Sequence, residues 1–481
     1  ALSPAPSRST RGPPRSRARL AGVVTNALPP GPRSPKVIQA LSFGRDPTAY
    51  LEQCVAEFGD TFTLRMPNDP PRVVVSSPAA VKAFFSLRPD AYRSDNLAIH
   101  LNLGRRSMLF RDGDQHKQLR RLTAPSLQAK RVRGYADAML EVTRHTVQRW
   151  QVDEAFPLLP EMNTIALDVV LRCVFGVDGS ERDTLRTQVL AWLRGTLSPA
   201  LFVTGMVVNP FRLRRVLDRA VDKASTQGRP LLFRGLAEAK VDILATLQRR
   251  IDRARQAPAS QDNVLSLLIA ARDEDGTPLS DEDILDQLVT FLVGGHETTA
   301  NTLAWALSMI LRRPKVLARV QDELREHFGN ADVEAGRANE LRYLDACLKE
   351  SMRMSPISPG PIRTLTKPCE IPGYTLPAGT ALWASIYLAH RRADVWDDPA
   401  VFRPERFLDD DAPSPQQFFP FGGGARRCLG ALFAEFEMRI VLAELLHRFH
   451  LEPTADIPRP IFAGISLSPE DGVPVRARLR A

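Results

Sequence analysis

The sequence predicts a mainly α-helical fold, with a large helical body and a small β-rich region. Of the 481 residues, 44% are hydrophobic, which is enough for a substantial core. Between about residues 114 and 355, apolar residues recur with a spacing near 3.6, the period of helices with one buried face. On both sides of this stretch, short strand-forming runs alternate with prolines and glycines. The β-rich region is therefore expected to combine segments from both ends of the chain.

The individual elements follow in chain order. The segment LPPGPRSP, residues 28–35, is proline-rich and therefore a stiff entry to the folded part. Residues 60–76 predict a β-hairpin, because two strand-forming runs flank a Pro-Asn-Asp-Pro-Pro turn. Apolar periodicity predicts helices over residues 132–151, 160–176, 181–195, 234–256 and 262–273. A last helix is expected from Cys428 to about Phe449, with an apolar stripe of Phe433, Phe436, Ile440 and Leu445.

The basic charge of the chain is concentrated near its N-terminal end. The net charge is +9, but residues 1–45 contain eight Lys or Arg and no acid, which leaves about +1 for the rest. The rest also lacks a basic stripe with interleaved aromatic residues, so no nucleic-acid binding is expected. Residues 1–26 are predicted to form a disordered basic tail and residues 27–481 a single domain. The composition of the tail fits an unstructured bacterial extension or an organelle transit peptide.

The sequence predicts no transmembrane anchor and no disulfide framework. The longest uncharged stretch, residues 195–211, falls short of the roughly 18 apolar residues of a spanning helix and is interrupted by two prolines. The cysteines are few and scattered, without a close pair: Cys54, Cys173, Cys347, Cys369 and Cys428. This distribution argues against disulfides and structural zinc and favours a reducing compartment. We expect a cytoplasmic protein, or an organellar one if the tail is a transit peptide.

A long predicted helix contains its own weak point. Ser280 and Asp283 resemble a capping box, and the helix is expected to run to about Arg312. Midway lies VGGHETTAN, residues 293–301, in which each glycine costs roughly 1 kcal/mol relative to alanine. A local widening there would make room for a small ligand or water, and an acid beside a hydroxyl can pass protons. Close packing between helices is the alternative reason for Gly-Gly and Thr-Thr.

Two pairs of charged residues have helical spacing. Glu350 and Arg353 lie three apart in the largely apolar segment LDACLKESMRM, and Arg406 in FRPERF is a candidate third member. His116 and Arg120 lie four apart in GDQHKQLRRL and also share a helix face. A surface ion pair worth under about 1 kcal/mol is the default interpretation of the first pair, and its apolar neighbours argue against this default. Taken alone, the second pair is equally compatible with a solvated basic face.

Residues 421–430, FGGGARRCLG, place a cysteine among four glycines and two arginines. Glycine suits positions where the backbone turns sharply or lies close against another group. Arginine is the usual partner of carboxylates and phosphates. A cysteine placed among glycines and arginines therefore indicates that its thiol binds a large, flat and acidic group.

Taken together, these stretches resemble the cytochrome P-450 family of haem-thiolate monooxygenases. The family's F-x-x-G-x-R-x-C-x-G pattern is matched by Phe421, Gly424, Arg426, Cys428 and Gly430. Its E-x-x-R pair is matched by Glu350 and Arg353, and its P-E-R-F motif by residues 404–407. Its oxygen-activating motif, small-Gly-x-acid-Thr, is matched by Gly294, Gly295, Glu297 and Thr298. The motifs occur in the family's order and spacing, and the resemblance covers residues 28–481.

The resemblance implies the cytochrome P-450 fold and haem b as the cofactor. Cys428 is then the thiolate ligand of the iron, an axial ligand that favours O–O cleavage. Phe421, Gly424 and Gly430 belong to the loop that holds it. The haem propionates are expected to bind His116, Arg120, Arg363 and Arg426. One position departs from the family pattern, because His116 stands where W-x-x-x-R often has tryptophan.

The resemblance also implies a reaction. A haem-dependent monooxygenase inserts one oxygen atom of O2 into a hydrophobic small molecule, and Glu297 and Thr298 are expected to organise proton delivery as its catalytic residues. No flavin or iron–sulfur domain is expected, so NAD(P)H would supply electrons through separate proteins, a ferredoxin and a ferredoxin reductase. The alternatives are a peroxide-driven peroxygenase of the same fold and a non-catalytic haem-binding protein. The acid–alcohol pair argues for the use of O2.

The expected walls of the substrate pocket are mostly aliphatic, which indicates a fatty-acid, terpenoid or polyketide-like substrate. They comprise residues 92–110, residues 197–211, the surroundings of Val293, residues 357–361 and residues 462–467. The segments LPPGP and FGDTFTLR resemble a cyanobacterial and myxobacterial branch of the family that oxidises fatty acids and terpenes.

Overall fold

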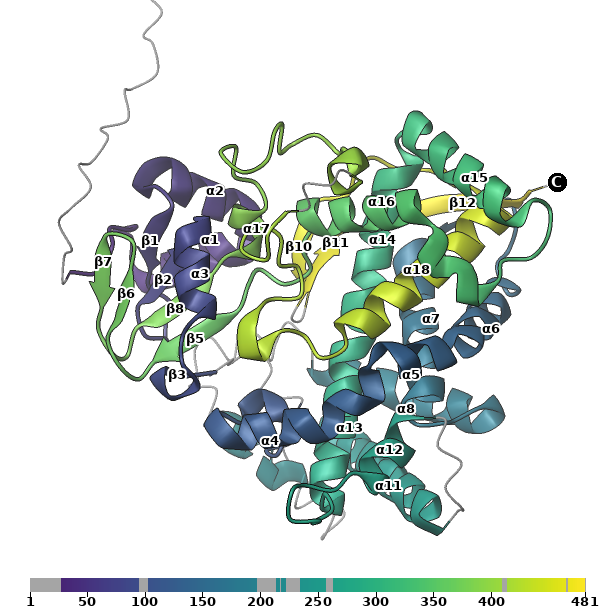
Figure 1. Ribbon diagram of the computed structural model, residues 1–481, viewed down its shortest axis with the longest axis horizontal. Coiled ribbons are helices and arrows are strands. Elements are labelled where there is room, and N and C mark those ends of the chain that lie inside the picture. Colours follow the sequence, from purple (N-terminus) through teal and green to yellow (C-terminus); the bar gives the residue numbers. More distant parts are fainter. Residues whose placement is uncertain are drawn as a thin grey trace, which may run out of the picture.

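The computed structural model describes residues 27–94, 103–196, 213–216, 218–221, 234–256, 263–408, 413–463 and 466–480. Figure 1 shows a large helical body beside a smaller β-rich region, in which purple N-terminal elements lie against green strands from the second half of the chain. The predicted mainly α fold with a small β-rich region is therefore confirmed. The predicted basic tail, residues 1–26, lies outside the described residues.

The largest sheet joins distant parts of the chain. Strands β1 (Thr61–Leu64) and β2 (Arg72–Val75) pair antiparallel, which confirms the predicted hairpin. β2 then pairs in parallel with β8 (Ala381–Ala384), and the order across the sheet is β1-β2-β8-β5-β3. The remaining strands of this region are β3 (Tyr92–Arg93), β5 (Ile362–Leu365) and the hairpin of β6 (Cys369–Ile371) and β7 (Tyr374–Leu376). Parallel pairing of β2 with β8 fixes the N-terminal hairpin against the second half of the chain.

Short helices cover this region, and long helices form the body. The covering helices are α1 (Lys36–Arg45), α2 (Pro47–Phe58), α3 (Pro78–Phe85) and α17 (Ile386–Ala389). The first helices of the body are α4 (Gly113–Thr123), α5 (Ala129–Gly134), α6 (Ala136–Val147), α7 (Leu158–Cys173) and α8 (Gly179–Thr196). The others are α11 (Arg234–Gln256), α12 (Val264–Ala270), α13 (Asp281–Gly295), α14 (Glu297–Leu311), α15 (Pro314–Phe328), α16 (Arg342–Met354) and α18 (Ala431–Arg448).

Two predicted helices were wrong in their bounds. The segment 132–151 is divided between α5 and α6, because the helical backbone is interrupted at Tyr135 (φ −92°, ψ −2°) directly after Gly134, a weak helix former. The last helix begins at Ala431 rather than at Cys428, because Cys428 belongs to the preceding turn. The helices predicted over 160–176, 181–195, 234–256 and 262–273 agree with α7, α8, α11 and α12 to within three residues at each end.

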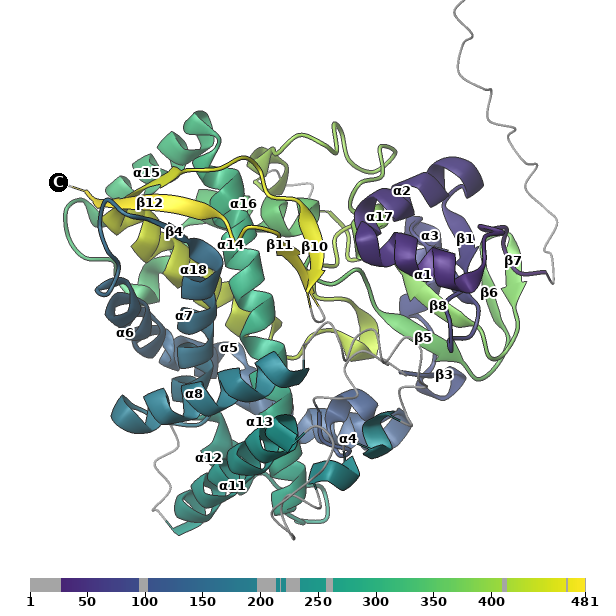
Figure 2. The same cartoon turned by 180° about the vertical axis from the view of Figure 1, so that it is seen from behind.

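Helix α14 runs through the centre of the body. Nearly all of its residues are buried, including Leu303, Trp305 and Leu307. A helix without an exposed face is enclosed by other elements. It packs against α7, α16, α15 and α18, and the views from both sides show it between these helices (Figures 1 and 2). Whatever this helix carries at its N-terminal end is therefore held rigidly.

The C-terminal strands return to α14. β9 (Phe449–Pro453), β12 (Pro474–Leu479) and β4 (Ala155–Pro157) form one sheet, while β10 (Pro460–Ala463) and β11 (Ser466–Pro469) form a hairpin. The indole Nε1 of Trp305 donates a hydrogen bond of 3.1 Å to the carbonyl of Leu467, which ties this hairpin to α14. In the described part of the chain, no helix is long and apolar enough to cross a membrane.

Candidate active site

The predicted long helix is present but interrupted at its predicted weak point. The hydroxyl of Ser280 accepts a hydrogen bond of 3.1 Å from the backbone N–H of Asp283, so the predicted cap at the start of α13 is formed. α13 ends at Gly295 and α14 begins at Glu297. His296 lies between them, buried, with its Nδ1 2.8 Å from the carbonyl oxygen of Leu292. The interruption places Glu297 and Thr298 in the first turn of the buried helix.

The two neighbouring glycines serve different purposes. A Cβ on Gly295 would lie 3.0 Å from Cγ2 of Val170, so this glycine allows α13 to pack closely on α7. A Cβ on Gly294 would meet nothing within 4 Å, and Gly294 is exposed although Val293 beside it is buried. The close-packing interpretation therefore holds for Gly295, and Gly294 borders open space.

Thr298 lies beside this open position. Its Oγ1 donates a hydrogen bond of 2.7 Å to the carbonyl of Gly294 in the preceding turn. A hydroxyl that donates in this way keeps its lone pairs free to accept a hydrogen bond from water. The hydroxyl is thus fixed at the interruption between α13 and α14.

The carboxyl of Glu297 is half-buried, and its pKa lies near neutral pH. Burial, partly offset by the neighbouring hydroxyl of Ser466 on β11, raises its pKa to about 7. A carboxyl with a pKa near the working pH can both give and take a proton. Ser466 was not found from the sequence, because it is brought to Glu297 only when the C-terminal hairpin packs on α14.

The segment 421–430, here called the cysteine loop, is closed by a hydrogen bond of its own backbone. The N–H of Cys428 donates a hydrogen bond of 2.9 Å to the carbonyl of Phe421. Gly424 has φ +64°, a conformation that L side chains rarely adopt, and a Cβ there would lie 2.8 Å from the carbonyl oxygen of Phe85. Gly424 is therefore needed both for the turn and for the approach to the end of α3.

Cys428 differs from the other cysteines. Cys54, Cys173, Cys347 and Cys369 are buried, whereas Cys428 is exposed. Its sulfur is nevertheless desolvated, because the surrounding protein raises the pKa of the thiol, while a hydrogen bond from the backbone of Gly430 and the positive charges of Arg120 and Arg427 lower it. A thiol that is both reachable by water and surrounded by protein faces an internal opening.

The four predicted propionate ligands lie close enough together to shift one another's pKa. Burial and, to a smaller extent, the charges of Arg426 and Arg120 together lower the pKa of His116 to about 4. Burial and the charge of Arg426, partly offset by Tyr92, lower the pKa of Arg363 to about 10. Burial also lowers the pKa of Arg120, and Cys428 counteracts this. Positive charges gathered in this way beside the neutral ring of His116 form a site for an anion.

Local contacts hold two of these cations in place. The guanidinium of Arg426 donates hydrogen bonds to the carboxylate of Asp112 and to the carbonyl of Arg111, just before α4. The guanidinium of Arg363 lies over the rings of Phe84 and Tyr92, 4.4 and 4.2 Å from their centroids. Asp112 was not found from the sequence, because nothing in its local pattern distinguishes it from an ordinary acid before a helix.

The Glu350–Arg353 pair is a core feature. Both side chains are 0% exposed, and Arg353 donates two hydrogen bonds to the Glu350 carboxylate, of 2.7 and 2.9 Å. Arg406 is the predicted third member, with its Nε 3.1 Å from Oε1 of Glu350. The interpretation as a surface ion pair was wrong, because α16 is enclosed on this side by the segment around residues 390–407.

A chain of hydrogen bonds runs from this pair to the cysteine loop. Nη1 of Arg353 donates a bond of 2.8 Å to the carbonyl of His390, and Nε2 of His390 accepts one of 3.0 Å from the N–H of Phe419. Burial lowers the pKa of His390 to about 3, so its ring is a neutral acceptor. His390 was missed in the sequence, where a lone histidine after an apolar run carries no signal.

The expected substrate pocket is described only in part. Residues 95–102, 197–211 and 464–465 lie outside the described residues. Of the expected walls, Tyr92 contacts Arg363, and the carbonyl of Ile357 accepts a hydrogen bond of 2.8 Å from the N–H of Leu467. Ile357 and Leu467 therefore lie side by side near Trp305 of α14, and the substrate pocket itself stays a prediction.

Comparison with known proteins gives the family. The cytochrome P450 family profile matches residues 29–473. The chain belongs to the cytochrome P450 family. A putative cytochrome P450 135B1 of Mycobacterium tuberculosis is 34% identical over 463 residues, which are 95% of this chain and 93% of that protein. A putative cytochrome P450 138 of the same species is 33% identical over 457 residues, 94% and 97% of the two chains.

A solved structure agrees with the fold of this P450. The retinoic acid-bound cyanobacterial CYP120A1 superposes with a TM-score of 0.79 and 23% identity, and covers 94% of this chain and 100% of its own. At this identity the likeness concerns the fold, and the predicted cytochrome P-450 fold is confirmed. By family this P450 is a haem- and iron-binding monooxygenase, an oxidoreductase. P450s typically work with redox partners.

Proposed function

We propose that this P450 inserts one atom of O2 into an apolar small molecule, of the fatty-acid, terpenoid or polyketide type. The observation that carries the proposal is the cluster of His116, Arg120, Arg363 and Arg426 around the reachable thiol of Cys428. Haem has the matching chemistry, because it is flat, its iron binds thiolate, and it bears two carboxylates. The residues present therefore fit this cofactor.

Each residue then has a defined task. Cys428 would be the iron ligand, the guanidinium groups of Arg120, Arg363 and Arg426 would hold the propionates through charge-assisted hydrogen bonds, and the neutral ring of His116 would donate a further hydrogen bond to them. The loop residues Phe421, Gly424 and Gly430 shape the backbone around the sulfur, and the N–H of Gly430 stabilises its negative charge. When bound, haem would supply the activation of oxygen, and a thiolate ligand from Cys428 would favour O–O cleavage.

Protons reach the site from the interruption between α13 and α14. The Glu297 carboxyl holds a proton up to about pH 7 and stands next in the chain to the Thr298 hydroxyl. Water in the open space beside Gly294 can accept a hydrogen bond from one group and donate to the other. Thr298 positions that water, and Glu297 provides the proton.

The proposal extends to the substrate, the redox partners and the cellular compartment. The solved cyanobacterial relative holds retinoic acid, an apolar molecule with a carboxylate, which supports an apolar substrate here. Electrons come from NAD(P)H through a ferredoxin reductase and a ferredoxin. Residues 27–481 form one domain, and the unpaired state of all five cysteines favours a reducing compartment such as the cytoplasm.

The CO difference spectrum of the reduced protein tests the assignment of Cys428. We expect the absorption band of a thiolate-ligated haem in the wild-type protein and its loss in Cys428→Ala. As matched controls, Cys54→Ala, Cys173→Ala, Cys347→Ala and Cys369→Ala should each keep the band. A band that survives in Cys428→Ala contradicts the assignment.

Turnover with surrogate redox partners tests the reaction. Substrate-dependent consumption of NADPH with formation of an oxygenated product is expected. If hydrogen peroxide supports product formation but NADPH with the partners does not, the protein is a peroxygenase. If neither does while candidate ligands bind, the haem-binding alternative is favoured.

A further inference from the structure

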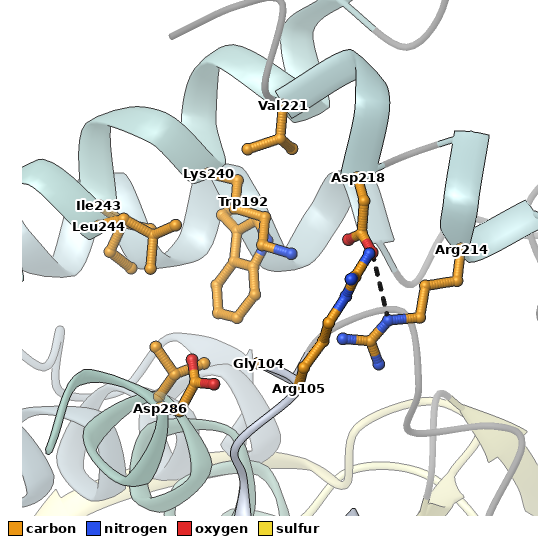
Figure 3. Close-up of a pocket in the computed structure, with 11 residues that line it drawn as sticks. Gly104, Arg105, Trp192, Arg214, Asp218, Val221, Lys240, Ile243, Leu244 and Asp286 are labelled. Carbon is orange, nitrogen blue, oxygen red and sulfur yellow. Dashed lines mark hydrogen bonds and ion pairs between the residues drawn. The ribbon is translucent and has the colours of Figure 1, made fainter. Parts of the chain in front are cut away.

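A cavity of about 300 Å³ lies between α8, α11 and α13, with charged and apolar walls. Figure 3 shows Lys240 entering it from α11, Asp286 on the opposite side, and Arg105 and Arg214 beside Asp218. The apolar walls include Trp192, Ile243 and Val289. Polar groups that converge in an otherwise apolar cavity are typical of a ligand site.

Both carboxylates of the wall are already engaged. Oδ2 of Asp218 lies 2.7 Å from Nη2 of Arg105 and 3.6 Å from Nε of Arg214. Oδ2 of Asp286 accepts a hydrogen bond of 2.7 Å from the backbone N–H of Arg106. Its Oδ1 occupies the space that a Cβ on Gly104 would need, at a distance of 1.6 Å, so Gly104 is required for this arrangement.

Among the described residues of the wall, Lys240 is the cationic side chain that has no ion-pair partner. Three cationic side chains face two carboxylates in the cavity, so its formal charge is +1. Within the described residues, the ammonium of Lys240 makes neither a salt bridge nor a hydrogen bond. The more distant charges of Asp218 and Asp286 favour its positive charge, and those of Arg214 and Arg105 oppose it. Burial lowers its pKa, as expected for an ammonium held away from both water and an anion.

The cavity lies along α13, before the interruption near Gly294. Asp286, Val289 and Val293 are spaced by three and four residues and therefore share one face of the helix. From Asp286 to Gly294 is eight residues, or about 12 Å at a rise of about 1.5 Å per residue. A molecule whose charged end binds in the cavity and whose apolar body extends about 12 Å along α13 would come level with Gly294.

We propose that this cavity binds the carboxylate of an amphiphilic substrate, with Lys240 as its ion-pair partner. The substrate class is then a long-chain or terpenoid monocarboxylic acid, held at its acid end and presented to the haem by its apolar body. This assignment rests on the proposed monooxygenase function and narrows its substrate. Lys240 is a specificity-determining residue that acts at a distance from the reacting atoms.

The test compares an acid with its matched alcohol. Dodecanoic acid and dodecan-1-ol are titrated into the haem-loaded protein by calorimetry. A charge-assisted contact corresponds to about a 10–100-fold tighter binding of the acid. Lys240→Met and Lys240→Gln should both remove this preference, and Lys240→Arg should keep it. Lys367→Met, which alters an exposed lysine paired with Asp90, is the matched control and should change nothing.

The Asp286→Asn variant should change the affinity for dodecanoic acid in the opposite direction. It removes a negative charge from the same wall and should strengthen the binding of dodecanoic acid, which a merely structural role of Lys240 does not predict. Equal binding of acid and alcohol by the wild-type protein, or a preference that persists in both Lys240→Met and Lys240→Gln, overturns the proposal. These titrations need no turnover, so such a failure leaves the spectral and NADPH tests of the proposed function unaffected.

Discussion

At the scale of single residues, Gly294 and Gly295 show how adjacent identical residues differ in purpose. Gly295 is required by the Val170 side chain 3.0 Å from its missing Cβ, whereas Gly294 faces open space. The Thr298 hydroxyl, bonded to the carbonyl of Gly294, lies at the boundary of that space. The local chemistry therefore depends on which side of α13 each residue occupies.

Thr298→Ala should uncouple the use of electrons from product formation. The variant is expected to fold and to bind haem, because Thr298 donates a single local hydrogen bond. Without the hydroxyl the water is no longer positioned, so NADPH consumption should yield hydrogen peroxide in place of product. Loss of a proton-transfer group costs on the order of 10²–10⁴-fold in the affected step.

NADPH consumed, peroxide released and product formed are measured together. Thr298→Ser keeps the hydroxyl and is the matched control, with a ratio of product to NADPH close to that of the parent protein. If Thr298→Ala itself keeps the parent ratio, Thr298 serves only to pack the helix.

Glu297 should make the stability of the protein depend on pH. The folded protein holds this proton up to about pH 7, whereas the unfolded chain releases it near the ordinary value of 4.5. The folded state thus binds more protons between these values, so its stability falls as the pH rises through this window. Glu297→Gln cannot titrate at this position. Relative to the wild type, its free energy of unfolding should therefore rise with pH, by on the order of 3 kcal/mol above pH 7.

The unfolding free energies of wild type and Glu297→Gln are compared from pH 4 to pH 8. Because all other groups titrate in both proteins, the difference isolates Glu297. A difference that stays constant over the range would show that the carboxyl has an ordinary pKa.

At the scale of elements, the buried pair on α16 connects the helical body to the cysteine loop. Arg353 donates to Glu350 and to the carbonyls of His390 and Pro399, and His390 accepts from the N–H of Phe419. Phe419 lies two residues before Phe421, where the cysteine loop begins. The pair therefore supports the position of Cys428 without contacting it.

Glu350→Ala should give largely haem-free or misfolded protein. Removal of one member of a buried pair leaves the other charge uncompensated, at about 3–5 kcal/mol. The matched control is Glu340→Ala, because Glu340 pairs with Arg337 at the same spacing but on the surface. That change should cost under about 1 kcal/mol. Haem content per protein and the unfolding free energy are the readouts, and a stable, fully haem-loaded Glu350→Ala contradicts the supporting role.

At the scale of the whole molecule, the site is held by parts that are distant in sequence. The parallel pairing of β2 with β8 brings residues 72–75 against residues 381–384. The cation cluster takes His116 and Arg120 from α4, Arg363 from β5 and Arg426 from the cysteine loop. Because no local segment contains more than two of these residues, the cluster exists only when the helical body and the β-rich region are packed together.

The sequence by itself determined the elements and the motifs that depend on near neighbours. The hairpin of β1 and β2, the cap at Ser280 and the weak point at residues 294–298 follow from turn residues, capping and helix propensity, which act over a few positions. The cysteine motif is equally local, since its glycines and arginines surround Cys428 within ten residues. Such features are written in adjacent residues and need no tertiary contact to be recognised.

Only the tertiary structure decided which charged side chains are buried and which residues they contact. Glu350 and Arg353 have the spacing of any surface pair, and enclosure by residues 390–407 makes them a core feature. Asp112, His390, Ser466 and Lys240 are ordinary in their local sequence, and each acquires its role from a residue far along the chain. Desolvation and Coulomb interactions depend on distance in space, so the charges of this site are defined by the fold and not by the order of the residues.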